Sequence, residues 1–119
     1  MTGRDAACLW DMRNAAETVL EFTKGCTAES FSADAKLRLA VERSIEIIGE
    51  AARRLSEDFR AAHPEVPWRQ IIAQRNVLIH EYDQIHPDAL WRLVSGDLPA
   101  LVSTLTSLLP PLPGEAPCP

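Results

Sequence analysis

The sequence predicts an all-α fold, an antiparallel bundle of four to five helices. Apolar residues recur at spacings of three and four over long stretches, which is the period of an α-helix. The strand-favouring residues Val, Thr, Tyr, Phe and Trp never form an alternating run. The 119 residues are 46% hydrophobic, which suits one domain with one apolar core.

The first helix is expected from about residue 5 to residue 24. Its apolar stripe is Leu9, Met12, Ala16, Val19 and either Phe22 or Thr23. Lys24 and Gly25 form a stop signal, since a cation suits the last carbonyl groups and a glycine suits the position beyond them. Residues 26–34 are expected to be a polar connection.

A second helix is expected to run without interruption from about residue 33 to residue 62. Its stripe is Val41, Ile45, Ile48, Ala52, Leu55, Phe59 and Ala62, with Leu37, Ala40, Ser44, Ile47 and Ala51 beside it. So wide an apolar face indicates either a central helix with two neighbours or a helix that also contributes to a dimer interface. Gly49 costs a helix up to about 1 kcal/mol relative to Ala, so we expect another helix to approach closely there.

The third helix is expected from about residue 67 to residue 82, after His63-Pro64 ends the second. A break at residues 85–87 precedes a fourth helix, which begins at Pro87 or Asp88 and reaches Ser95.

Gly96-Asp97-Leu98-Pro99 indicates either a kink or a new helix with Asp97 as N-cap. The apolar pattern of a helix resumes beyond this point and continues to Leu108. The chain is therefore expected to divide into a helical domain, residues 1–109, and a Pro-rich, disordered tail, residues 110–119.

Composition excludes several classes of protein. The net charge of −5 disfavours tight, non-specific nucleic-acid binding, which depends on Lys and Arg. Three widely spaced cysteines form no CxxC pair, so neither a disulfide framework nor a zinc site is expected. The N-terminal residues lack the apolar core of a signal peptide, and no apolar run approaches the roughly 20 residues of a membrane span. A cytoplasmic protein without a membrane partner is expected.

The stretch RNVLIHEY, residues 75–82, gathers Arg75, Asn76, His80 and the chain's single tyrosine, Tyr82. Asn76 and His80 are four residues apart and share a helix face. Arg75 and His80 point about 140° apart on a regular helix. They can border one pocket if the long arginine reaches round, if the helix end loosens, or if a second copy of the helix faces the first.

These residue types suit metal-independent cleavage of RNA. Histidine can exchange protons near neutral pH, and the guanidinium fork of arginine matches phosphate oxygens. The residues alone leave a structural interpretation open, in which Arg75 makes an ion pair, His80 caps the helix end and Tyr82 packs at the surface. For Glu50 and Arg53-Arg54, both a supporting role and a solvated helix face stay open.

The string R-x4-H-x-Y, here Arg75, His80 and Tyr82, resembles the motif of the HEPN superfamily, specifically its HepT-like branch. IEIIGEAARRLSEDF, PEVPWRQIIAQRNVLIHEYDQI and LWRLVSGDLPAL look like three blocks of that family in the right order. The resemblance covers roughly residues 5–109. It implies an all-helical homodimer whose motif residues line a cleft between two protomers.

The resemblance also implies a function, the toxin of a toxin–antitoxin module. The toxin would be a metal-independent endoribonuclease without a cofactor. In it His80 is the general acid or base, Arg75 binds the phosphate and stabilises the transition state, and Asn76 orients either the histidine or a phosphate oxygen. An MntA-like minimal nucleotidyltransferase would neutralise it by transferring AMP from ATP onto Tyr82. Local arginines such as Arg53, Arg54 and Arg69 would have to grip the RNA. The alternative is a non-catalytic helical dimer that mainly binds such a nucleotidyltransferase.

Overall fold

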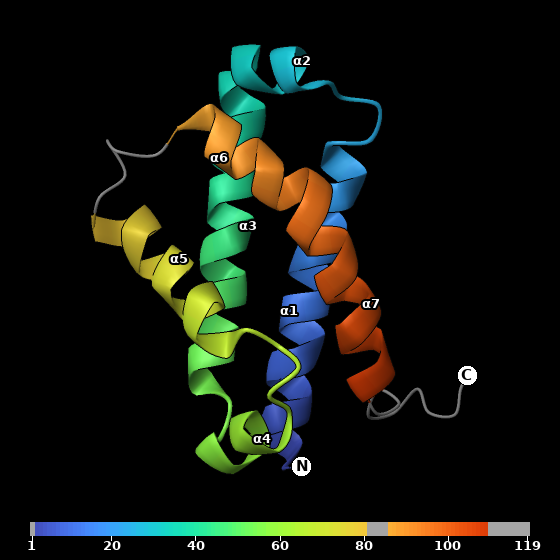
Figure 1. Cartoon of the computed structure of the whole chain (residues 1–119), viewed down its shortest axis with the longest axis vertical. Helices are drawn as coiled ribbons and strands as arrows, with labels where there is room; N and C mark the ends of the chain where they lie inside the picture. The colour runs from blue at the N-terminus through green and yellow to red at the C-terminus, as the bar shows by residue number, and fades with distance from the viewer. Residues whose placement is uncertain (1, 81–85, 110–119) are drawn as a thin grey trace.

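A computed structural model describes the backbone of residues 2–80 and 86–109, with the side chains of these residues apart from 78–80. All regular secondary structure in this part of the chain is helical, which confirms the all-α prediction (Figure 1). The elements follow in the order α1 (Gly3–Phe22), α2 (Ala28–Ala33), α3 (Ala35–Arg54), α4 (Glu57–Ala62), α5 (Trp68–His80), α6 (Pro87–Arg92), η2 (Leu93–Asp97, a π-helical turn) and α7 (Leu98–Leu108).

Helices α1 and α3 are the centre of the bundle and run antiparallel to each other (Figure 1). Helix α7 packs on α1, and α5 packs on α3, each antiparallel to its neighbour. The apolar stripes predicted for the first two long helices meet in the core, which α1 and α3 fill with Cys8, Leu9, Met12, Ala15, Ala16, Val19, Val41, Ile45, Ile48, Ala51 and Ala52. None of the helices in the described ranges is both long and apolar enough to cross a membrane.

The end of α1 settles which residue completes its stripe. Thr23 is buried, and its hydroxyl donates to the Val19 carbonyl at 2.8 Å, while Phe22 is 51% exposed. Gly25 then adopts a φ of 80°, a conformation that suits glycine, so the predicted stop is confirmed. The connection after it contains the short helix α2, which the sequence did not predict. Thr27 caps α2, and the fully buried Phe31 anchors it.

The prediction of one helix over residues 33–62 is wrong. Helix α3 ends at Arg54, Leu55 is extended with a ψ of 149°, and Ser56 caps the separate helix α4. The cause is Asp5 of α1, whose carboxylate accepts hydrogen bonds from the Ser56 backbone N–H at 2.8 Å and from its hydroxyl at 2.9 Å. Because the Ser56 N–H bonds to α1, it no longer serves an uninterrupted helix.

The C-terminal helices decide between a kink and a restart. Helix α6 passes directly into the π-helical turn η2, and η2 passes into α7. Asp97 keeps helical φ and ψ angles and makes no capping hydrogen bond, so the kink is confirmed and the N-cap is not. The end of the third predicted helix, residues 81–82, lies outside the described residues, as does the tail, residues 110–119.

Helix α5 lies unusually close to α3 at Gly49. A Cβ atom placed on Gly49 would overlap Cβ of Arg75, would lie 3.0 Å from its Cγ and would lie 3.2 Å from the Ile71 carbonyl oxygen. The close approach that the mid-helix glycine predicts is therefore confirmed. The neighbour at the point of contact is the residue that begins the RNVLIHEY stretch.

We predict that Asp5→Ala lowers the free energy of unfolding by about 2–3 kcal/mol, because it leaves the half-buried N–H and hydroxyl of Ser56 without their charged acceptor. Burial raises the pKa of Asp5, but hydrogen bonds from Ser56 and Thr2 outweigh it and hold the pKa below 3.8. This stabilisation is complete above the unfolded pKa and is lost as pH falls through the folded pKa, below about pH 4. Urea unfolding across this pH range measures both effects.

The matched control is Glu21→Ala, which removes an exposed acid from the same helix and should leave stability within about 0.5 kcal/mol of wild type. Equal effects of the two substitutions would show that the Asp5–Ser56 link does not stabilise the fold.

We predict that Gly49→Ala destabilises the protein by about 1–3 kcal/mol, although Ala favours helix, because the new methyl group forces α5 away from α3. Gly96→Ala is the control, since nothing lies within 4 Å of a Cβ atom there. Thermal unfolding should separate the two variants, and a Gly49→Ala protein as stable as wild type would contradict the close contact.

Candidate functional site

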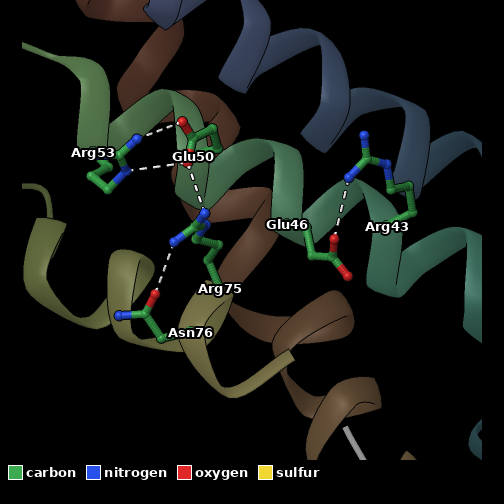
Figure 2. A network of polar contacts seen from close by, with 6 residues as sticks. All are labelled: Arg43, Glu46, Glu50, Arg53, Arg75 and Asn76. Atoms are coloured by element: carbon green, nitrogen blue, oxygen red, sulfur yellow. Dashed lines mark hydrogen bonds and ion pairs between the residues drawn. The ribbon is translucent and has the colours of Figure 1, made fainter. Parts of the chain in front are cut away.

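The RNVLIHEY stretch begins beside an ionic network that joins α5 to α3 (Figure 2). Nη2 of Arg75 lies 3.1 Å from a carboxylate oxygen of Glu50, on α3. Glu50 also accepts two hydrogen bonds from Arg53, at 2.8 and 3.2 Å. One carboxylate therefore holds two guanidinium groups, and the three charges together carry a net positive charge.

Arg75 also donates to the neighbouring side chain. Its Nη1 lies 3.0 Å from Oδ1 of Asn76, so the guanidinium group is held by Glu50 at one nitrogen and by Asn76 at the other (Figure 2). Two hydrogen-bond partners fix both the position and the plane of the group. Such fixed donors are suited to stabilise negative charge that develops on a bound molecule.

The network keeps Glu50 ionised. Hydrogen bonds from Arg53 are the main cause of a lowered pKa for Glu50, with further contributions from the charges of Arg53, Arg75 and Arg54 that outweigh the effect of burial. The hydrogen bond to Glu50 in turn raises the pKa of Arg53. Glu50 therefore stays a carboxylate from neutral pH down to below its ordinary pKa near 4.5, and its ion pair with Arg75 persists over that range.

The side chain of Arg75 reaches toward the face of α5 that carries Asn76. The Cα positions of residues 75 and 76 point about 100° apart on the helix, yet the Arg75 guanidinium reaches Asn76. Residue 80 lies one turn beyond Asn76 on the same face of α5. Because the His80 side chain is not among those described, all three ways to bring Arg75 and His80 to one pocket stay open.

The structure does not describe the side chains of two of the four candidate residues. His80 is the last residue of α5 and its side chain is not among those described, and Tyr82 lies outside the described residues. Of the predicted site, the structure brings together Arg75 and Asn76. The roles assigned to His80 and Tyr82 stay predictions.

The network borders a shallow depression of about 260 Å³ between α3, α1 and α5. Its lining consists of Asp11, Arg43, Glu46, Ile47, Glu50, Ala51, Arg54 and Arg75. Three arginines and three carboxylates line the depression, and Arg53, bound to Glu50, adds one positive charge beside them, in a chain whose net charge is −5. The local excess of positive charge suits an anionic ligand better than the overall composition does.

The surrounding residues settle what the sequence left open. Glu50 and Arg53 support Arg75 and are not merely a solvated face, and Arg54 lines the depression. Arg69 lies elsewhere, on the first turn of α5. Gly49 is the sequence signal that could have identified Glu50. A glycine in mid-helix marks where α5 comes close to α3, and Glu50 is the next residue of α3, within reach of Arg75.

Among the side chains that the structure describes, no group of three or more His, Cys, Asp and Glu residues is placed to hold a metal ion.

Comparisons with known proteins identify the family of the chain. Residues 12–108 match the model of a family described as "Ribonuclease HepT-like". The "Putative RNase MJ1380" of Methanocaldococcus jannaschii is 42% identical over 102 residues, 85% of this chain and 94% of that protein. The "Probable ribonuclease HepT" of Thermococcus cleftensis is 42% identical over 93 residues, 78% and 84% of the two chains. No solved structure matches the chain significantly.

The matched span runs from within α1 to the last residue of α7, so it contains the α3–α5 contact and the whole RNVLIHEY stretch. These lines of evidence agree, and the chain belongs to the HepT-like ribonuclease family.

Proposed function

We propose that the protein is a metal-independent endoribonuclease and the toxin of a toxin–antitoxin module. The observation that carries the proposal is the fixed Arg75 guanidinium, held between Glu50 and Asn76 where α5 meets α3. Membership of the HepT-like ribonuclease family supports the same reaction.

The proposed reaction is attack of a ribose 2′-oxygen on the adjacent phosphorus. A base takes the 2′-OH proton, a P–O bond forms to the 2′-oxygen, and the bond to the 5′-oxygen breaks as an acid protonates that oxygen. His80 exchanges the protons, since imidazole titrates near neutral pH. Arg75 binds the phosphate oxygens and stabilises the charge that develops on them. Asn76 orients the Arg75 guanidinium.

Two protomers together supply what one reaction needs. A single histidine cannot be base and acid in the same step, but two copies of His80 across a dimer cleft can take one role each. Ile47 supports such a pairing, because it is 37% exposed on α3 and borders the depression that contains Arg75. An apolar residue at this position suits contact with a second copy of the chain.

Regulation is proposed to act through Tyr82. A nucleotidyltransferase antitoxin would direct the Tyr82 hydroxyl oxygen onto the α-phosphorus of ATP, which forms a phosphodiester and releases pyrophosphate. The added AMP is a bulky anion two residues from His80. It would fill the cleft and repel the phosphates of RNA.

We predict that His80→Ala lowers the cleavage rate of single-stranded RNA by about 10²–10⁴-fold, as expected for loss of a general acid or base. Arg75→Ala should lower it by about 10²–10³-fold through loss of transition-state stabilisation. The assay follows purified protein with labelled RNA in the presence of a chelator, and growth of cells that express each variant provides a second measurement.

His86→Ala and Arg92→Ala are the matched controls, because both residues are exposed and lie outside the depression. They should cleave RNA as wild type does. Cleavage only with added metal would overturn metal independence alone. If wild type leaves RNA intact with and without metal, the endoribonuclease proposal fails. A non-catalytic dimer that binds a nucleotidyltransferase then becomes the better account.

We predict that incubation with the partner nucleotidyltransferase and ATP raises the intact mass of the protein in steps of one AMP and abolishes RNA cleavage. Tyr82→Phe, which lacks only the hydroxyl oxygen, should gain no mass and should stay active in the presence of the partner. Unchanged mass of the wild-type protein, or equal modification of Tyr82→Phe, would remove Tyr82 from the mechanism.

A further inference from the structure

A second group of arginines lies near the other end of α5. Arg60 of α4 and Arg69 of α5 line one shallow hollow of about 410 Å³, together with Glu57, Ala61, Trp68 and Ile72. The hollow combines apolar lining with two cations and one carboxylate. Its volume is within the range of pockets that hold small organic molecules.

In the described part of the chain, no ion pair compensates the charges of the two arginines. The Nε atom of Arg60 is buried and has no hydrogen-bond partner. A buried donor without a partner is costly, and an anionic acceptor that orders the guanidinium group would offset that cost. By contrast, Arg53 and Arg75 are both bound to Glu50.

The hollow is aligned with the proposed cleavage residues. Arg69 is seven residues before Asn76 and eleven before His80, so these three positions fall within about 40° on the surface of α5. Arg69 and Asn76 are both exposed, and Ala73 between them is exposed and small. One exposed helix face therefore leads from the hollow as far as Asn76, and residue 80 follows one turn later, about 16 Å along the helix axis from Arg69.

We propose that this hollow is a nucleotide subsite for the single-stranded RNA substrate. Arg60 and Arg69 bind a phosphate, and Ala61, Trp68 and Ile72 provide the apolar surface for its base. A stacked strand advances about 3.4 Å per nucleotide, so the subsite holds a nucleotide on the order of five positions from the scissile phosphate. The inference rests on the proposed endoribonuclease function and adds to it a preference for longer RNA.

Chemistry favours RNA over an acidic protein segment as the occupant. The exposed face of α5 connects the hollow to Asn76. An RNA strand bound at the cleavage site would continue along that face. A phosphate also accepts paired hydrogen bonds from guanidinium forks, which the two arginines can present together.

The test compares wild type with the double variant Arg60→Gln and Arg69→Gln on a long single-stranded RNA and on a dinucleotide. We expect the ratio of kcat/KM for the long RNA to that for the dinucleotide to fall roughly tenfold in the double variant. The slope of log KM against log salt concentration for the long RNA should decrease by about 0.7, because the two arginines together bind one phosphate and each phosphate neutralised on a single strand contributes about 0.7. Lys36→Gln, on the first turn of α3, is the control and should keep the wild-type ratio.

A binding assay separates the subsite from catalysis. The same two substitutions are placed in a His80→Ala protein, and binding of labelled RNA is measured by fluorescence anisotropy, with thermal unfolding to verify the fold. Weakened binding with a smaller salt slope supports the subsite even if wild type cleaves nothing, an outcome that overturns only the cleavage proposal. Unchanged RNA binding in a folded variant overturns the subsite, and if binding of a nucleotidyltransferase weakens instead, the hollow is a protein-docking surface.

Discussion

The ion pair between Glu50 and Arg75 is the interaction on which the site depends. It crosses the contact between α3 and α5, and it forms where Gly49 allows the two helices to touch. A larger residue at position 49 would hold α5 away and would take Arg75 out of reach of Glu50. The pair therefore joins a packing requirement of the bundle to the position of one guanidinium group.

Other parts of the fold keep this interaction in place. The hydrogen bonds that Ser56 donates to Asp5 end α3 at Arg54, so Arg53 and Arg54 lie in its last turn, where cations interact favourably with the helix dipole. Arg53 then shares Glu50 with Arg75, which keeps the carboxylate ionised while leaving the cluster with a net positive charge. A chain with a net charge of −5 thus presents a local site suited to a phosphate.

Helical periodicity and glycine placement are local signals, so the long helices, the motif and the close approach at Gly49 could be predicted from the sequence, while the short helix α2 could not. Sequence reasoning missed the interruption at Leu55, since the apolar stripe runs through it and the cause, Asp5, lies 51 residues before Ser56. It left Glu50 open for a similar reason, because Arg75 is brought to it only by the packing of α5 on α3. Helical geometry predicted the divergence of Arg75 from residue 80, but the hydrogen bond from Arg75 to Asn76 emerged only from the structure.

A double-mutant cycle on RNA cleavage tests the central role of Glu50 most directly. Glu50→Gln, Arg75→Ala and the combined variant are compared in kcat/KM, with the free energy of unfolding measured in parallel. We predict that Glu50→Gln lowers cleavage roughly tenfold to hundredfold in the wild-type background and has no further effect once Arg75 is absent. Equal losses in both backgrounds would contradict the claim that Glu50 acts by positioning Arg75.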